Sequence, residues 1–151
     1  MTFRGSLEDR IAIRELIESY ADAVTRRDAD AWAALWDEDA RWLLPNLGAG
    51  FRLEGKRAIV PAWRKMMIDY HGPEHAPWTI SFSSVLGGMD VDGDRATVRS
   101  WSFETFDDGK GRTIHLKGRY DDRLIRYDAR WLFAERSWDL LPLDDFREMA
   151  V

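Results

Sequence analysis

Apolar residues in the first part of the chain recur at the spacing of a helix. Ser6 starts a capping-box pattern with Asp9, which predicts that a helix begins there. The apolar face of this helix extends to about Arg26. It consists of Ile13, Leu16, Ile17, Tyr20 and Val24. We therefore expect a long amphipathic helix that packs one side against a core.

Two shorter helices and a strand are expected over residues 28–70. Asp28 is placed to cap a short helix, which an acidic run at residues 37–39 ends. Its apolar residues are Trp32, Leu35 and Trp36. Residues 40–44 are strand-like, and the glycine-containing stretch after them indicates a loop or an irregular hairpin. Residues 56–70 carry the third helix, whose apolar side consists of Ile59, Trp63, Met66, Met67 and Tyr70.

The second half of the chain changes to the period of β-strands. Four strand-like runs occupy residues 78–91, 94–106, 112–126 and 130–138. Turn-forming residues separate them, as in hairpins, and residues 142–151 form a polar tail. Helices followed by an antiparallel meander predict one α+β domain over residues 1–151, with the helices on one face of the sheet.

Composition and charge narrow the classes of function. The chain has 151 residues, a net charge of −5, no cysteine and 8 Trp. Acidic and basic residues are interleaved, so the basic stripe that nucleic acids require is missing. The polar N-terminus lacks the apolar segment of a signal peptide, and no apolar run reaches the roughly 20 residues that span a bilayer. We expect a cytoplasmic protein that binds neither nucleic acid nor membrane.

Three segments resemble the SnoaL-like branch of the NTF2-like superfamily. They are LEDRIAIRELIESYADAVTRRDADAWAALWDEDARW (7–42), VDGDRATVRSW (91–101) and GRYDDRLIRYDARWLFAER (118–136). The resemblance covers nearly the whole chain. It implies a cone in which a strongly curved, mostly antiparallel sheet and three N-terminal helices enclose an apolar pocket. The superfamily includes scytalone dehydratase, a dehydrochlorinase, a bile-acid dehydratase, ketosteroid isomerase, polyketide cyclases and proteins that only bind, so the resemblance is less specific for activity.

The chain departs from this family at the residues that remove a proton. The dehydratase-like members are expected to use an Asp on the first helix and a His on the first long strand. The matching positions here hold Thr25 and Phe82, and the position of a second His falls near Trp101. The sequence therefore leaves the general base unidentified.

Polar residues on the pocket side are the candidates for catalysis. Tyr20 lies on the apolar face of the first helix, where a phenol can donate a hydrogen bond to a substrate oxygen. Alternation along the strand places Tyr120 in the inner row. The resemblance implies that Arg136 lies near the cavity and stabilises negative charge. The alternatives are a core tyrosine bonded to backbone and an ordinary ion pair of the arginine.

Two histidines flank a helix-breaking Gly-Pro pair. His71 and His75 fit the pattern H-x-x-E-H, but Gly72 and Pro73 prevent the regular helix that a metal site of this kind needs, so no metal is expected. One of the two, His75 first, is a candidate base at the pocket mouth. The alternative is a solvated loop histidine. His115 alternates with the inner row and is expected on the outer face.

Aromatic and sulfur-containing side chains are expected to form most of the pocket wall. The candidate substrate-binding residues are Thr25, Trp42, Trp63, Met67, Trp78, Phe82, Trp101 and Phe103. Such a lining favours a flat, apolar, aromatic or polycyclic ligand.

The function expected from these features is a cofactor-independent lyase or isomerase of a small hydrophobic oxygenated compound. Cofactorless C–C cleavage would use similar residues. The alternatives are a non-catalytic binding module that has lost the His–Asp pair, and an accessory subunit like the small subunit of ring-hydroxylating dioxygenases. A homodimer or homotrimer is expected, with Trp131 and Phe133 on the outer face of the sheet.

Overall fold

Helices and a seven-stranded sheet form the fold in a computed structural model, which describes residues 2–46, 50–73 and 80–141. In chain order the elements are β1 (Phe3–Arg4), α1 (Leu7–Arg26), α2 (Ala29–Ala33), β2 (Trp36–Leu44), β3 (Phe51–Glu54), α3 (Lys56–His71), β4 (Ile80–Asp92), β5 (Arg95–Asp107), β6 (Thr113–Tyr127) and β7 (Arg130–Leu141). The α+β prediction is therefore confirmed.

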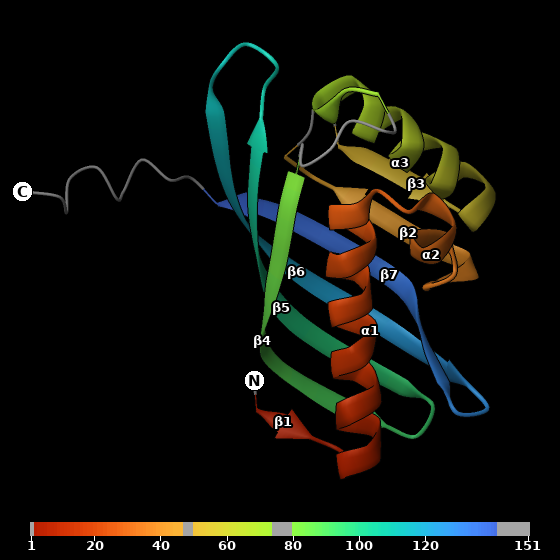
Figure 1. Cartoon of the computed structure of the whole chain (residues 1–151). Coiled ribbons are helices and arrows are strands. Elements are labelled where there is room, and N and C mark those ends of the chain that lie inside the picture. The colour runs from red at the N-terminus through yellow and green to blue at the C-terminus, as the bar shows by residue number, and fades with distance from the viewer. Residues whose placement is uncertain (1, 47–49, 74–79, 142–151) are drawn as a thin grey trace, which may run out of the picture.

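The sheet has the strand order β1-β4-β5-β6-β7-β2-β3. The strands β4 to β7 form the expected antiparallel meander, whereas β2 pairs with β7 in parallel. Figure 1 shows α1 lying across one face of the curved sheet, with α2 and α3 beside it near β2 and β3. The helices thus cover the concave face, and none of the described helices lies on the other face of the sheet.

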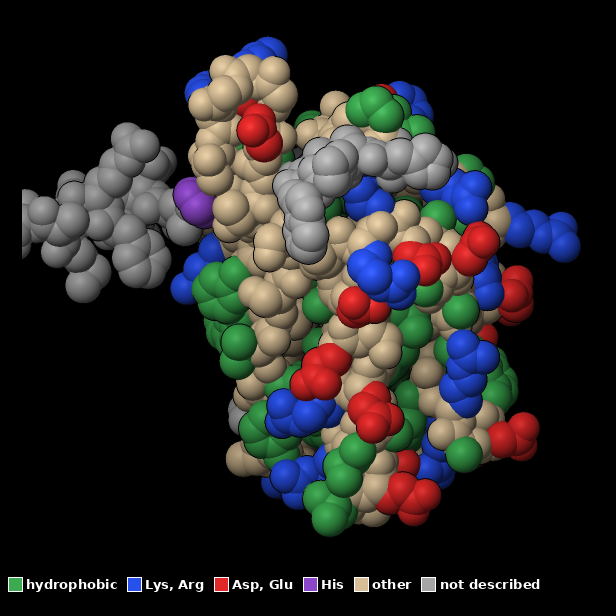
Figure 2. All heavy atoms as spheres, in the orientation of Figure 1, with side chains coloured by type: hydrophobic (Ala, Val, Ile, Leu, Met, Phe, Trp, Pro, Cys, Tyr) green, Lys and Arg blue, Asp and Glu red, His purple; other side chains and the backbone are tan. Residues whose placement is uncertain are grey.

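The two sides of α1 differ in polarity as the sequence predicts. The buried side carries Ile13, Leu16, Ile17, Tyr20, Ala23 and Val24. Acidic and basic side chains occupy the exposed side (Figure 2). Two ion pairs on this side, Arg14–Glu18 and Arg26–Asp22, follow the i, i+4 spacing of a helix surface. None of the helices in the described part of the chain is long and apolar enough to cross a membrane.

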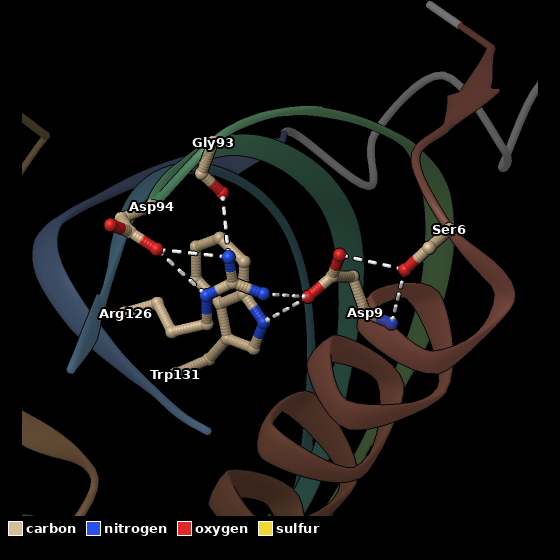
Figure 3. Close-up of polar contacts among 6 residues, drawn as sticks. All are labelled: Ser6, Asp9, Gly93, Asp94, Arg126 and Trp131. Atoms are coloured by element: carbon tan, nitrogen blue, oxygen red, sulfur yellow. Dashed lines mark hydrogen bonds and ion pairs between the residues drawn. The ribbon is translucent and has the colours of Figure 1, made fainter. Parts of the chain in front are cut away.

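The start of α1 is fixed to the far ends of the hairpins. Ser6 caps the helix by accepting from the Asp9 backbone N–H at 3.0 Å, and its hydroxyl donates to the Asp9 carboxylate. That carboxylate also accepts from Arg126 at 2.6 Å and from the Trp131 indole at 3.2 Å (Figure 3). Arg126 in turn donates to Asp94 in the β4–β5 turn. The Asp9 carboxylate thereby links the start of α1 to the end of β6 and the start of β7.

Tryptophans occupy the core between α2, α3 and β2. The rings of Trp32 and Trp63 stack with centroids 4.7 Å apart, and Trp36 and Trp42 pack against Trp32 at 4.9 and 5.6 Å. This cluster joins the short helix and the third helix to the parallel strand pair. Half of the tryptophans of the chain thus belong to this cluster and contribute to the packing of the core.

Two predictions about tryptophan and phenylalanine positions are wrong. Trp36 does not belong to the second helix, which ends at Ala33; it begins β2 and pairs in register with Phe133. Trp131 and Phe133 are 4% and 0% exposed and face the core, not the outer face of the sheet. The chain reaches this arrangement because β2 pairs with β7, which lies far away in the sequence.

Candidate functional site

An apolar pocket of about 190 Å³ lies between α1, α3 and the concave face of the sheet. Its aromatic walls include Tyr20, Trp42, Trp63, Phe82, Tyr120 and Trp138. Met66 and Met67 from α3 and Leu116 from β6 add to the apolar lining. The predicted lining residues Trp42, Trp63, Met67 and Phe82 thus surround one cavity, as do Tyr20 and Tyr120.

Glu104 brings a carboxyl group into this apolar wall. It lies on β5 between Phe82 of β4 and Leu116 of β6, its cross-strand neighbours. No hydrogen bond or ion pair joins it to another residue in the described part of the chain. Burial in these surroundings raises the pKa of Glu104 to about 7. At neutral pH the group is therefore shared between its acid and its carboxylate form.

His71 is the second ionisable group of interest at the pocket. It ends α3, is 6% exposed, and meets the ring of Phe106 edge-on with centroids 4.6 Å apart. Burial, and then the nearby charge of Arg27, lower the pKa of His71 to about 4. The imidazole is consequently neutral at pH 7.

The position of His71 depends on Arg27, which follows the last residue of α1. The Arg27 guanidinium donates to the backbone oxygens of His71, Gly72 and Pro73 at 3.2, 2.6 and 2.7 Å. It thus supplies donors to carbonyl groups at the end of α3. His75 and Trp78, both predicted at the site, lie outside the described residues. Among the residues that are described, no group of three or more His, Cys, Asp or Glu side chains is arranged to hold a metal ion.

Tyr20 and Tyr120 face one another across the pocket floor. Their ring centroids are 6.0 Å apart, and the residues are 2% and 4% exposed. Burial raises the pKa of both phenols above the ordinary value, so both hydroxyls keep their protons. Each can therefore act as a hydrogen-bond donor within the apolar surroundings.

Arg136 lies behind the two tyrosines and does not line the pocket. Its side chain is fully buried, and its guanidinium carbon is 3.9 and 3.7 Å from the ring centroids of Tyr20 and Tyr120. Its Nε atom is 3.6 Å from the carboxylate of Asp122, which is buried as well. Arg136 therefore does not contact a ligand directly, and its charge reaches the pocket through the aromatic rings.

The two positions that match the family's proton-removing pair contact each other. The Phe82 backbone N–H donates to the Thr25 hydroxyl at 3.0 Å, and this hydroxyl lies 3.3 Å from the Phe82 carbonyl oxygen, to which it donates. Thr25 is therefore not part of the pocket lining, in contrast to the prediction. It holds α1 against β4, and only the ring of Phe82 reaches the cavity.

Trp101 and Phe103 are predicted in the pocket, but the structure places them on the opposite face of the sheet. Phe103 is 42% exposed. The Lys117 ammonium lies over both rings, 6.0 and 5.9 Å from their centroids. The inner row of β5 instead holds Ser100, Ser102 and Glu104. The sequence pattern does not indicate Glu104, because hydrophobicity favours the aromatic row as the inner one.

A pocket of this kind, between N-terminal helices and a curved sheet, is the feature that the resemblance implied. The model of the SnoaL-like domain matches residues 5–137. The chain belongs to the SnoaL-like domain family. No curated protein sequence gives a significant match to the chain.

Solved structures share the fold of this SnoaL-like protein. A scytalone dehydratase candidate from Novosphingobium aromaticivorans is 23% identical, with a TM-score of 0.74, over 90% of this chain and 86% of that one. The hexachlorocyclohexane dehydrochlorinase LinA-type3 from Novosphingobium barchaimii is 18% identical, with a TM-score of 0.70, over 90% and 88%.

A third similar structure is a variant form of Rv3472 from Mycobacterium tuberculosis, a protein of unknown function. It is 23% identical, with a TM-score of 0.70, over 95% of this chain and 78% of that one. Two of these three structural neighbours are thus named for elimination reactions, and the third is described as a protein of unknown function. At such identities the likeness shows the fold, and the chemistry has to be argued from the side chains of the site.

Proposed function

We propose that this SnoaL-like protein is a cofactor-independent lyase or isomerase in which Glu104 is the general base. The observation that carries the proposal is the one unpaired carboxyl group among the described residues of an apolar pocket, where burial raises its pKa to about 7. A general base is most effective when its pKa lies near the working pH, because the basic form is then both present and strong. A perturbed carboxyl in a cleft is also typical of a functional site.

His71 is a weaker candidate for the same role. Its pKa of about 4 leaves it unprotonated at neutral pH, but it also makes the imidazole a poor acceptor for a carbon-bound proton. We therefore assign His71 the role of a neutral hydrogen-bonding group beside the substrate, and Glu104 the proton transfer.

The size and charge of the pocket support a small neutral substrate. An engineered apolar cavity of about 150 Å³ in another protein binds benzene. The present pocket of about 190 Å³ therefore suits a compound with one ring. An anionic substrate would meet the Glu104 carboxylate without a lysine or arginine among the lining residues that are described.

The proposed reaction starts with removal of a proton from a carbon that lies next to an electron-withdrawing group. The C–H bond breaks, the proton moves to the Glu104 carboxylate, and the bonding pair forms a new double bond. In an elimination the leaving group departs with its own electron pair. In an isomerisation Glu104 returns the proton to another carbon.

The two tyrosines stabilise the negative charge that develops in this step. Tyr20 and Tyr120 stay protonated and donate hydrogen bonds to a substrate oxygen or to the leaving group. Arg136 stacks against both rings and adds positive charge behind them. Its role is to support the tyrosines, since it does not touch the substrate.

The test is a product-resolved assay of neutral one-ring compounds that carry a hydroxyl or halide β to an acidic C–H bond. We expect Glu104→Gln to lower turnover by about 10² to 10⁴, the usual contribution of a general base. Asp22→Asn, an exposed acidic residue of α1, is the control that should leave turnover unchanged. Turnover should rise with pH through about 7 as Glu104 loses its proton, and EDTA should not affect it.

Equal turnover of Glu104→Gln and the wild-type protein on any substrate found would overturn the assignment of the base.

A second candidate function is ligand binding without catalysis. It is favoured by Thr25, whose hydroxyl is bonded to the Phe82 backbone at the position where relatives are expected to hold an Asp. Saturable binding of one-ring compounds without formation of any product would support that alternative.

A further inference from the structure

The indole of Trp138 lies across the sheet and occupies a space formed by Gly118 of β6 and Ser102 of β5, which we call the seat. Trp138 belongs to β7, is 7% exposed and lines the pocket. Its Nε1 donates to the hydroxyl of Ser102 on β5 at 2.9 Å, and Ser102 has no exposed surface. Because β6 runs between β5 and β7, the indole has to cross β6 to make this bond.

The residue of β6 that the indole crosses is Gly118. Gly118 pairs in register with Ser102, and Tyr120, the next inner residue of β6, pairs with Trp138. A Cβ atom at Gly118 would lie 1.8 Å from Trp138 Nε1, 2.4 Å from its Cε2 and 2.8 Å from the Ser102 oxygen. Real non-bonded contacts do not reach such distances, so a side chain at this position and the indole exclude each other.

Gly118 is needed for space and not for an unusual backbone. Its backbone does not lie in the left-handed region, in contrast to the turn glycines of the chain. A residue with a Cβ therefore fits the local strand geometry, and only the Trp138 ring opposes it.

The seat determines how far Trp138 extends into the cavity. The ring is held flat by the glycine below it and by the Ser102 hydroxyl at its polar edge, with the ring of Tyr120 6.4 Å away. The sheet backbone blocks movement of the indole on one side and the pocket lies on the other. Filling the seat therefore displaces the ring into the space that a ligand would occupy.

We propose that Gly118 and Ser102 set the size limit of the pocket by seating Trp138, so that the site accepts neutral one-ring ligands and rejects fused two-ring ligands. As far as turnover is concerned, this inference rests on the proposed function. As far as binding is concerned, it is independent of Glu104. Gly118 and Ser102 are positioning residues, because neither lines the pocket.

The test measures the dissociation constants of phenol and 2-naphthol by calorimetry at pH 6, where both probes are neutral. We expect the wild-type protein to bind phenol and to bind 2-naphthol at least tenfold more weakly. Trp138→Ala should reverse this order. Gly118→Ala should weaken phenol binding at least tenfold, and Ser102→Ala should reduce the discrimination between the two probes.

The double variant Gly118→Ala/Trp138→Ala separates displacement of the indole from general damage to the fold. Without an indole the added methyl group meets no ring, so the double variant should bind both probes like Trp138→Ala. Trp138→Phe, whose shorter ring cannot reach Ser102, should give intermediate discrimination and serves if the alanine variant does not fold. The inference is overturned if Gly118→Ala folds and binds phenol like the wild-type protein.

The inference is also overturned if the double variant binds as weakly as Gly118→Ala, or if the wild-type protein binds neither probe. Failure of the proposed function gives a different result. In that case Glu104→Gln retains full turnover, while the order of the dissociation constants across the Trp138 and Gly118 variants stays as expected.

Discussion

Glu104 owes its properties to what surrounds it. Its cross-strand neighbours are apolar, and no cation among the described residues is paired with it. The loss of water around the carboxylate is therefore not offset, and the proton is held up to a pH of about 7. The same feature that prepares the group for catalysis makes the folded state less favourable when the group is ionised.

The cost of ionising Glu104 predicts how stability depends on pH. Because the folded-state pKa of Glu104 lies above its ordinary value of 4.5, the folded protein binds more protons than the unfolded chain between about pH 4.5 and pH 7. The free energy of unfolding should therefore fall as the pH rises through this range. Glu104→Gln should remove this part of the dependence.

Urea unfolding at pH 5 and pH 8 measures the effect. At each pH we compare the free energy of unfolding of Glu104→Gln with that of the wild-type protein. We expect this difference to be about 1 to 3 kcal/mol more favourable to the variant at pH 8 than at pH 5. Asp122, whose pKa burial also raises, contributes with the same sign in both proteins and cancels in this comparison. An identical pH dependence of the two proteins would show that Glu104 is well solvated.

Arg136 and Asp122 form a buried pair whose members depend on each other. Removal of the acid in Asp122→Leu should cost about 3 to 5 kcal/mol of stability, because it leaves a buried guanidinium without its counter-ion. The double variant Asp122→Leu/Arg136→Met should recover most of that loss. Urea unfolding of the single and double variants measures the coupling. A loss of stability in the double variant that equals the summed losses of the two single variants would contradict the coupling of Asp122 and Arg136.

The inner row of β5 shows where residue-level prediction stops. Helical spacing and strand alternation place Tyr20 and Tyr120 correctly. On β5 the choice lies between Trp101 with Phe103 and the polar row of Ser102 with Glu104. Hydrophobicity favours the aromatic row, yet the polar row is the inner one, with Ser102 buried and Glu104 lining the pocket. Ser102 is stabilised there by the Trp138 indole, a contact that strand periodicity does not contain.

At the scale of elements, α1 is held in place at both of its ends. Its start is bound to β6 and β7 through Asp9, and its last turn to β4 through Thr25. Arg27, which follows it, binds the end of α3. Tyr20 is therefore carried by a helix that is held at both ends. This supports a fixed distance between its hydroxyl and the sheet.

The bonds of Asp9 predict a loss of stability on substitution. Asp9→Asn should destabilise the protein by about 1 to 2 kcal/mol, because charge-assisted bonds to Arg126 and Trp131 are lost or weakened. Glu8→Gln, in the same exposed first turn, is the control and should cost about 0.5 kcal/mol or less. Thermal unfolding at pH 7 measures both variants.

Acidification gives a second test of the same contact. The Ser6 hydroxyl, followed by the Trp131 indole and Arg126, lowers the pKa of Asp9 below its ordinary value. Its contribution to stability is therefore present above the ordinary value of 3.8 and is lost as the pH falls below it. The difference between the wild-type protein and Asp9→Asn should shrink on acidification. A constant difference would contradict this account of the contact.

The elements themselves are largely predictable, and the failures have one cause. The capping residues Ser6 and Asp28 and the long strands lie where the local pattern indicates. The segment from Trp36 to Asp39 is predicted to end a helix, but it is a strand. The Phe133 N–H donates to the Leu35 carbonyl oxygen at 2.9 Å, so the local preference yields to pairing with β7.

At the scale of the whole molecule, the fold forms an apolar pocket, and Glu104 is the one carboxyl group among its described lining residues. The parallel pairing of β2 with β7 and the stacking of Trp32 on Trp63 bring α3 over the sheet and complete the cavity. The family resemblance correctly indicated the SnoaL-like fold. It did not indicate Glu104, because that residue lies at neither of the positions where relatives are expected to hold the base.

The central claim is that folding raises the pKa of one glutamate in this pocket. It is tested most directly by NMR titration of the side-chain carboxyl carbons in protein labelled with ¹³C at glutamate. We predict one resonance with a midpoint at about pH 7, which is missing in Glu104→Gln and returns to the ordinary range in urea. Titration of every glutamate in the folded protein between about pH 4 and pH 5 would contradict the account.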